Sequence, residues 1–427
     1  MNAPAPGANF GTVCVVGLGY IGLPTAAFIA STGTTVIGVD LNEDHVAQIN
    51  KGEVPFFEPD FESLLAGVVT QGRLVAQATT PAADAFIVCV PTPFKDNHQV
   101  DPKYIEAAAE NIAPQLKGGE LIILESTSPP GTTEQMAEHI LELRPDLSNE
   151  VGRPNSIYFA HCPERVLPGR IMIEMAQNDR VIGGTTVRAS ELARELYSGF
   201  CRGEMLVTDA RTAEMAKLTE NSFRDVNIAF ANELSLICDE LGIDVWELIE
   251  LANHHPRVNI LQPGPGVGGH CIAVDPWFIV AAAPEQSKLV QMARNVNDSK
   301  PEHVVQRVLE RAKRFKAPVI ATLGIAFKPD VDDLRESPAV KIVDTLAGEM
   351  ESADIRVIEP HAFELPTELS RHANVRLEEL PSALEAADIV LLLVDHREFK
   401  ALDPSEFESK ILIDTKGVWR KQRAVGV

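Results

Sequence analysis

The first 130 residues alternate short apolar runs with longer segments that favour helices. Apolar, β-prone runs occupy residues 12–16 and 34–40, and a helix-like segment, residues 23–33, joins them. Two further apolar runs, at 84–95 and 120–130, each end in a loop rich in threonine and proline. This alternation predicts βαβ units around a parallel sheet.

Ligands bind at the carboxyl ends of strands in an open parallel sheet. Thr92 and Thr127 follow two of the predicted strands, so both are candidate cofactor contacts. Ordinary turn chemistry is the alternative explanation for these two threonines.

From residue 212 the pattern changes to one long helix without proline, which ends at Gly242. Apolar residues surround much of it, so we expect a largely buried helix of roughly 45 Å. A polar face interrupts this pattern at spacings of four and three, formed by Lys217, Asn221 and Arg224. This face is either a solvated stripe that pairs with Glu214, Glu220 and Asp225, or a polar wall that faces a cleft.

The last third returns to the alternation of strands and helices, with apolar runs at 317–327, 353–360, 387–396 and 410–419. We therefore predict an α/β protein in which a long central helix joins two Rossmann-like, doubly wound parallel-sheet domains. The expected domains are residues 1–210, 211–312 and 313–427. The loop after the first of these runs lacks a glycine fingerprint. It contains Lys328 and Arg335 instead, which suit a different phosphate ligand. The alternative role of these two residues is an ion pair with Asp330, Asp332 or Asp333.

Composition narrows the possible functions. The 427 residues are 45% hydrophobic and 23% charged, as in a soluble multidomain enzyme, and the net charge of −23 disfavours nucleic acid as a partner. An anionic substrate would need a local cluster of basic residues. Apolar runs stay well below the roughly 20 residues of a membrane span, the N-terminus lacks a secretory signal pattern, and the six cysteines are scattered. We expect a cytoplasmic protein without a membrane partner.

The segment from Gly17 to Gly22 reads Gly-Leu-Gly-Tyr-Ile-Gly and lies between the first strand and the first helix. Asp40 ends the next strand, which completes a dinucleotide-binding fingerprint. Gly17 makes the tight turn, Gly19 allows the pyrophosphate to approach, and Gly22 allows the helix and strand to pack closely. Tyr20 and Ile21 complete the loop, and Asp40 favours NAD over NADP. The alternatives are a glycine-rich turn without a ligand and, for Asp40, an N-cap of the following helix.

A second glycine-rich loop, GPGVGGHCIAVDP, spans residues 264–276 and contains Cys271. Glycines allow close backbone approach and positive φ angles, so the thiol is either a structural group or a nucleophile within reach of a ligand. The nearby pair His254 and His255 lacks further metal ligands at the usual spacing, and we expect no metal.

Six motifs occur together in a fixed order, and with them the chain resembles the UDP-glucose/GDP-mannose dehydrogenase family from Thr12 to about Trp419. They are VGLGYIGLP, STSPPG, CPER, AEMAKLTENSFRDVNIAFANE, PGPGVGGHC and FKPDVDDLRESP. The stretches NSFRDVNIAFANELSLIC and HPRVNILQPGPGVGGHCIAVDPWF are typical of the UDP-N-acetyl-D-mannosamine dehydrogenase branch. Pro168 stands where the UDP-glucose branch carries a second glutamate, which argues against UDP-glucose as the substrate.

The resemblance implies a four-electron oxidation of a sugar C6 alcohol to a carboxylate, with two NAD consumed. Cys271 would hold the intermediate aldehyde as a thiohemiacetal and then as a thioester. Lys217 and Asn221 would stabilise the oxyanions, and Glu164 and Asp275 would share proton transfer and water activation.

The resemblance also implies a UDP-sugar substrate, a homodimer, and roles for the three expected domains: NAD binding, dimerisation with the active site, and UDP-sugar binding. Whether Arg257 serves its own site or that of a neighbouring subunit stays open. Thr127 and Arg335 are implied at the cofactor, beside the fingerprint residues and Thr92. The implied substrate contacts are Arg165, Val166, Lys217, Asn221, Arg224, His255, Arg257, Gly268 and Lys328.

Other functions are open on the sequence alone. They include a 6-dehydrogenase of another UDP-sugar, such as UDP-N-acetylglucosamine or UDP-glucose, and a two-electron hydroxyacid dehydrogenase. A non-catalytic NAD-binding regulator is a further alternative, which the intact Lys217, Asn221 and Cys271 oppose. His270 is an alternative general base, although neighbours in a chain seldom align their side chains.

Overall fold

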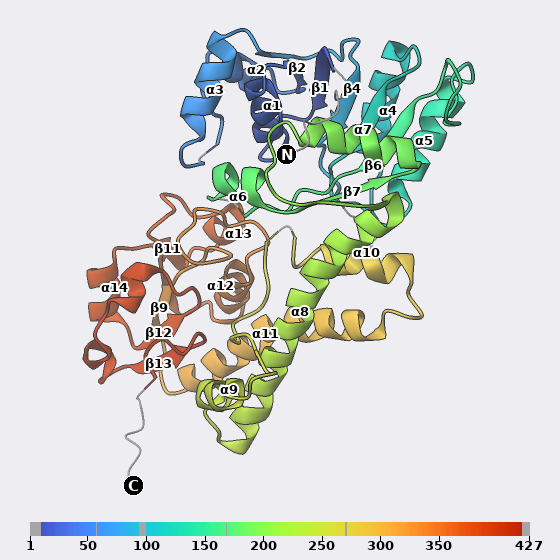
Figure 1. The fold of residues 1–427 in the computed structure, drawn as a ribbon. Coiled ribbons are helices and arrows are strands. Elements are labelled where there is room, and N and C mark those ends of the chain that lie inside the picture. Colours follow the sequence, from blue (N-terminus) through green and yellow to red (C-terminus); the bar gives the residue numbers. More distant parts are fainter. Residues whose placement is uncertain (1–9, 57, 94–99, 168, 270, 421–427) are drawn as a thin grey trace. The chain divides into compact units, whose positions relative to one another are not determined.

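The computed structural model of the chain describes residues 10–56, 58–93, 100–167, 169–269 and 271–420. The chain forms two compact units, Met1–Glu220 and Asn221–Val427. The first unit contains an eight-stranded sheet, blue to green in Figure 1, and the second a five-stranded sheet, orange to red. The α/β class with two parallel sheets and a long helix is therefore confirmed. The three domain boundaries expected from the sequence stay a prediction.

The strand order of the first sheet is β3-β2-β1-β4-β5-β6-β7-β8, and all neighbours are parallel except β6 and β7. The order reverses between β1 and β4, so their carboxyl ends form the switch point where such sheets bind ligands. The bounds are β1(Thr12–Val16), β2(Thr35–Val39), β3(Leu74–Gln77), β4(Ala85–Val88), β5(Leu121–Leu124), β6(Tyr158–His161), β7(Arg180–Gly184) and β8(Met205–Asp209).

Helices cover this sheet and account for its apolar central strands. Every residue of β4 and β5 is buried, as in a parallel sheet covered on both faces. Nine of the ten residues of α1 are buried, which explains why its sequence is apolar all round. The helices are α1(Gly22–Ser31), α2(Glu43–Asn50), α3(Phe61–Thr70), α4(Lys103–Ile112), η1(Ala113–Gln115), α5(Thr132–Leu143), α6(Ile171–Gln177) and α7(Val187–Tyr197).

The predicted long helix is α8(Ala210–Leu241), with 32 residues. Gly242 follows it with a φ of 69°, the left-handed conformation that favours glycine after a helix. The expectation that α8 is largely buried is wrong for the single chain, because Phe223 is 68% exposed and Leu241 65% exposed. Phe230 and Ile237 are also exposed, so an apolar stripe runs along α8.

The second sheet has the order β11-β10-β9-β12-β13 and is parallel throughout. The four apolar runs form β9(Val319–Leu323), β10(Asp354–Ile358), β12(Ile389–Leu392) and β13(Ile411–Asp414), whereas the three-residue β11(Val375–Leu377) was not predicted. The helices of this unit are α9(Val245–Asn253), α10(Asp275–Ala282), α11(Lys288–Ala312), α12(Pro338–Glu349), α13(Thr367–Ser370), α14(Leu380–Ala386), α15(Arg397–Lys400) and η2(Pro404–Phe407). Among the described residues, no helix is both long and apolar enough to cross a membrane.

Candidate active site

The glycine fingerprint has the geometry that a pyrophosphate requires. Gly17 has a φ of 93°, and a Cβ there would lie 2.5 Å from the Cys89 carbonyl oxygen. A Cβ on Gly22 would lie 1.9 Å from the Gly17 carbonyl oxygen, so both positions require glycine. A Cβ on Gly19 would meet nothing within 4 Å, and the N-terminus of α1 has no side-chain cap. This arrangement leaves open space beside the N-terminus of α1 and fits the phosphates of NAD.

Asp40 connects the fingerprint to the end of β2. Its Oδ2 accepts a hydrogen bond from Leu18 N at 2.9 Å, and its Oδ1 accepts one from Asn42 N at 2.9 Å. Each carboxylate oxygen has a second lone pair that can accept a bond from a ribose hydroxyl. The alternative role of Asp40 as a helix N-cap is wrong, because Asn42 caps α2 through bonds from Asp44 N and His45 N.

The two predicted threonine contacts lie together at the carboxyl edge of the sheet. Thr92 Oγ1 donates to the Thr127 carbonyl oxygen at 2.8 Å, which joins the loops that follow β4 and β5. Both side chains are half-buried. The sheet therefore places these residues on the side of the switch point where a nucleotide binds.

Tyr20 is fixed by a residue that sequence reasoning missed. Its hydroxyl donates to Glu58 Oε2 at 3.0 Å, and the buried Glu58 also accepts bonds from Gly169 N and Ile171 N, each at 2.8 Å. Glu58 thus joins the fingerprint to the segment after the Pro-Glu-Arg motif. Val166 packs in the same region, against an apolar cluster around Phe28. Glu58 lies in no motif, so the sequence carries no signal for it.

Glu164 belongs to a buried cluster of charges. Its Oε2 accepts a bond from Arg180 Nη2 at 2.6 Å, and Arg180 Nη1 lies 3.2 Å from Glu125 Oε1. The Tyr197 hydroxyl donates to Glu125 at 3.1 Å, and the tyrosine ring faces the guanidinium at 4.5 Å. Burial raises the pKa of Glu125, and Arg180 acts against this shift. Two carboxylates therefore share one buried cation, so Arg180 determines where Glu164 is held.

The acidic residues near the polar face of α8 have partners elsewhere. Glu214 accepts from Gly131 N at 2.5 Å and from Thr133 N at 2.7 Å. Glu220 pairs with Arg165 at 2.7 Å, and Asp225 pairs with Arg294. The predicted alternative, a solvated stripe in which these acids pair with Lys217, Asn221 and Arg224, is therefore wrong. Within the described ranges, neither Lys217 nor Arg224 forms an ion pair with a carboxylate.

Cys271 is exposed and lies four positions before Asp275, the first residue of α10. The Cys271 carbonyl oxygen accepts a bond from Asp275 N at 2.8 Å. The buried Asp275 carboxylate accepts a bond from Asn221 Nδ2 at 2.5 Å. One hydrogen-bonded chain therefore leads from α8 to the cysteine, and Lys217 precedes Asn221 on α8 by one turn.

The glycine loop before Cys271 packs with its backbone against the loop after β9. A Cβ on Gly268 would lie 2.4 Å from the Glu336 carbonyl oxygen. Gly269 has a φ of 85°, and a Cβ there would lie 2.9 Å from the Phe327 ring. These glycines bring the thiol close to the basic loop that contains Lys328 and Arg335.

Lys328 and Arg335 both interact electrostatically with Cys271 and with Asp333. Burial lowers the pKa of Lys328, and the positive charge of Arg224 lowers it further. Asp333 and Cys271 act in the opposite direction and raise this pKa. The hydrogen bonds that Arg335 donates to the Asp333 carboxylate raise the pKa of Arg335, and the two side chains lie 2.6 Å apart. The ion pair considered as the alternative is therefore present for Arg335. The amine of Lys328 instead lies 5.4 Å from the centre of the Phe327 ring.

His255 and Arg257 lie on an exposed loop after α9. Asn253 closes this loop, because its side chain exchanges two hydrogen bonds with Ile260, at 2.7 and 3.0 Å. In the part of the chain that the structure describes, no hydrogen bond or ion pair joins the Arg257 side chain to another group. The two predictions that concern Pro168 and His270 lie outside the described residues.

Asn232, a buried residue of α8, holds the start of the glycine loop. Its Oδ1 accepts a bond from Gly264 N at 2.9 Å, and its Nδ2 donates to Asn297 at 2.8 Å. One turn further along α8, Ser235 accepts a bond from Lys300 Nζ at 2.7 Å. Burial lowers the pKa of Lys300 to about 8.

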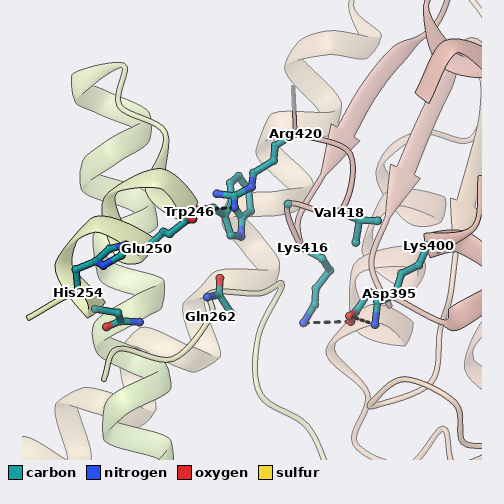
Figure 2. Close-up of a pocket in the computed structure, with 11 residues that line it drawn as sticks. Trp246, Glu250, His254, Gln262, Asp395, Lys400, Lys416, Val418 and Arg420 are labelled. Carbon is teal, nitrogen blue, oxygen red and sulfur yellow. Dashed lines mark hydrogen bonds and ion pairs between the residues drawn. The ribbon is translucent and has the colours of Figure 1, made fainter. Parts of the chain in front are cut away.

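A cavity of about 630 Å³ lies elsewhere in the second unit, where α9 approaches the carboxyl ends of β12 and β13. Figure 2 shows Lys400 and Lys416 on either side of Asp395, at 2.7 and 3.5 Å. The described residues that line it include none of the predicted site residues. The chemistry expected of Cys271 therefore does not belong to this cavity.

Comparison with known families finds three adjacent matches along the chain. The UDP-glucose/GDP-mannose dehydrogenase family, NAD binding domain, matches residues 11–201. The central domain of the same family matches residues 211–299, and its UDP binding domain matches residues 321–421.

Relatives of known function resemble nearly the whole chain. An NDP-N-acetyl-D-galactosaminuronic acid dehydrogenase of Ralstonia nicotianae is 57% identical, over 97% of this chain and 98% of the relative. A UDP-N-acetyl-D-mannosamine dehydrogenase of Escherichia coli is 54% identical, over 96% of this chain and all of the relative. A solved UDP-D-ManNAc dehydrogenase from Pyrococcus horikoshii is 38% identical and superposes with a TM-score of 0.86 over 97% of both chains.

Proposed function

The chain belongs to the UDP-glucose/GDP-mannose dehydrogenase family and is an NAD-dependent nucleotide-sugar dehydrogenase, and from this we propose its substrate and mechanism. The proposed reaction is the oxidation of UDP-N-acetyl-D-mannosamine at C6 to UDP-N-acetyl-D-mannosaminuronate. The observation that carries it is that the exposed Cys271 lies at the end of a chain of hydrogen bonds that runs from Asn221 through Asp275 to the Cys271 carbonyl oxygen.

NAD, when bound, accepts a hydride in each of the two oxidation steps. In the first step Asp275 and Glu164 share the removal of the proton from the C6 hydroxyl. Lys217 and Asn221 stabilise the negative charge that develops on that oxygen, so the alcohol becomes an aldehyde.

In the second step the Cys271 sulfur bonds to the aldehyde carbon and forms a thiohemiacetal. Removal of a hydride from this carbon, together with transfer of the hydroxyl proton to the carboxylates of Asp275 and Glu164, gives a thioester. Water, activated by Asp275 and Glu164, then attacks the thioester carbon, which releases the Cys271 thiolate and the C6 carboxylate. Covalent capture keeps the reactive aldehyde out of solution.

A chain with a net charge of −23 needs local cations to bind UDP. We assign this role to Lys328 and Arg224. The pKa of Lys328 is raised by Cys271 and lowered by Arg224, so both residues are close enough to Lys328 to interact with it. Arg335 lies in the same loop as Lys328, between β9 and α12, and contacts the cofactor in this proposal. Arg165, Val166, His255, Arg257 and Gly268 complete the proposed substrate contacts.

UDP-N-acetyl-D-galactosamine is a second candidate substrate. The observation that favours it is the 57% identity to the Ralstonia nicotianae enzyme, a level similar to the 54% identity to the Escherichia coli enzyme. The two sugars differ in configuration at C2 and C4, so few contacts decide between them.

The experiment counts NADH while the purified enzyme consumes a limiting amount of each sugar. The panel contains UDP-N-acetyl-D-mannosamine, UDP-N-acetyl-D-galactosamine, UDP-N-acetylglucosamine and UDP-glucose. We expect two NADH per UDP-N-acetyl-D-mannosamine and the highest kcat/KM for it. One NADH per sugar would identify a two-electron dehydrogenase, and none a non-catalytic protein.

We further propose a homodimer in which the apolar stripe of α8 is covered by a second copy. The stripe consists of Phe223, Phe230, Ile237 and Leu241, each exposed in the single chain and spaced by seven, seven and four residues. Light scattering should give twice the chain mass, and Phe230→Asp should shift it toward that of one chain. In this proposal residues 1–210 bind NAD, 211–312 form the dimer and 313–427 bind the UDP-sugar.

A further inference from the structure

The second sheet has a switch point of its own, because its strand order reverses between β9 and β12. The loops after β9, β10 and β12, together with α15, bring four metal-ligating side chains together there. They are Asp330, His361, His396 and Glu398, and each offers a ligand atom within 4.8 Å of the others.

Glu359, at the end of β10, corresponds to Asp40 at the end of β2. Its Oε2 accepts bonds from Ile325 N at 2.8 Å and Ala326 N at 3.0 Å, as Asp40 does from Leu18 N. His396 Nε2, however, lies 3.1 Å from Glu359 Oε1, so this carboxylate is paired with a histidine. This end of the sheet therefore differs from the end of β2, where no histidine contact to Asp40 is found among the described residues.

The partners of His396 determine which ring nitrogen carries the proton. Its Nδ1 accepts a bond from Asp330 N at 2.9 Å and must therefore have a lone pair. Its Nε2 then carries the proton and donates it to the Glu359 carboxylate. A histidine that donates one N–H to a carboxylate and turns the other nitrogen to the ion is the usual arrangement at metal centres. Nδ1 lies 3.8 Å from Asp330 Oδ1, which belongs to the same cluster.

Two atoms of the cluster lack partners. His361 Nε2 and Glu398 Oε2 are buried atoms without a hydrogen bond among the described residues. The His361 ring lies 5.0 Å from the His396 ring, centre to centre. Buried polar atoms normally have partners, so these two ligand atoms, beside a histidine whose Nδ1 has a lone pair, favour this cluster as a place for an ion.

We propose that Asp330, His361, His396 and Glu398 bind one divalent transition-metal ion. Imidazole and carboxylate donors together suit Zn²⁺ and its neighbours in the first transition series. Zinc–ligand distances of about 2.0–2.2 Å bring ligand atoms to roughly 3–4 Å from one another, so the side chains need to move inward only slightly. As His396 Nδ1 binds the ion, Asp330 N loses its bond to that nitrogen. The ion would tie the loop that contains Lys328 and Arg335 to α15.

The test measures metal binding directly and does not depend on catalysis. Untagged full-length enzyme, freed of metal with a chelator, is titrated with ZnCl₂ in a calorimeter and with CoCl₂ by visible absorption. We expect one ion per chain. His361→Ala and Glu398→Gln should each weaken binding at least tenfold, and Glu359→Gln, which alters the group that orients His396, by about 10- to 100-fold.

Two controls separate this site from others. His372→Ala removes a histidine of the same unit that pairs with Asp344, and it should leave the affinity unchanged. Cys271→Ser removes the exposed thiol and should also leave it unchanged. Circular dichroism of each metal-free variant establishes folding, and Glu398→Gln changes a side chain that is 40% exposed, so it should fold even if His361→Ala does not.

Absence of zinc binding by the wild-type enzyme would overturn the proposal. Equal affinity in the wild type, His361→Ala and Glu398→Gln would also overturn it, as would loss of binding in Cys271→Ser alone.

Discussion

Asn221 Nδ2 donates to Asp275 Oδ2 at 2.5 Å, and this bond joins the middle of α8 to the first turn of α10. Sequence spacing placed Asn221 on a polar face, but only the fold brings it to Asp275, 54 positions later. The bond uses one lone pair of the Asp275 carboxylate, the group that we assign to proton transfer. It also fixes the amide that we assign to oxyanion stabilisation.

Asn221→Ala should lower kcat by about 100-fold or more, because an oxyanion donor and the orientation of Asp275 are lost together. KM should change much less. The matched control is Asn227→Ala, which removes an amide that bonds only to the Phe223 carbonyl on the same helix among the described residues. Steady-state kinetics of both variants check this prediction, and equal rates for the two would contradict it.

Gly268→Ala should reduce kcat/KM at least tenfold, because the new Cβ would lie 2.4 Å from the Glu336 carbonyl oxygen and push the Cys271 loop away from the basic loop. Gly264→Ala is the control in the same loop, since its Cβ would meet only the flexible Lys416 side chain, with Nζ at 3.4 Å and Cδ at 3.9 Å. Kinetics with saturating NAD measure both. An active Gly268→Ala enzyme would show that close packing of the two loops is not required.

Arg180→Gln should lower the free energy of unfolding by about 3–5 kcal/mol, because it leaves Glu125 and Glu164 buried without their shared cation. Arg188→Gln, which removes an exposed ion pair with Glu191, should cost less than about 1 kcal/mol. Urea denaturation of both variants provides the measurement. Similar losses in the two would mean that the buried cluster contributes no more than a surface pair.

The free energy of unfolding should depend on pH because of the buried Lys300. Burial lowers its pKa from 10.5 to about 8 in the folded chain, so between these values the unfolded chain holds a proton that the folded chain has lost. Stability therefore rises with pH in this window, by about 1 kcal/mol per pH unit relative to Lys300→Met. Urea denaturation at pH 8, 9 and 10 tests this difference. Parallel curves for the two proteins would contradict it.

The parts of the fold that the sequence predicts are those with local signals. The Gly17–Gly22 fingerprint, the strands that form long apolar runs and the end of α8 at Gly242 each follow from periodicity or from one glycine. The strands β3, β6, β7, β8 and β11 were not predicted. The exposure of Phe223 was misjudged, because an apolar residue is buried only where another element covers it, and periodicity does not identify that element.

The residues that sequence reasoning missed act through contacts distant in the chain. Glu58 meets Gly169 and Ile171 more than 100 positions away, and Arg180 meets Glu125 55 positions away. The cluster of His361 and His396 likewise comes from loops of separate strands. Such partners lie at no fixed spacing, so only the folded structure shows them.

The central claim is that Cys271 bonds covalently to the half-oxidised sugar, and mass spectrometry of the Cys271 peptide tests it most directly. The enzyme is quenched in acid during turnover of UDP-N-acetyl-D-mannosamine with NAD and then digested. We predict a Cys271 peptide heavier by the mass of the sugar nucleotide as a thioester, absent when NAD is omitted. A Cys271 peptide of unmodified mass throughout turnover, while two NADH form per sugar, would contradict the covalent mechanism.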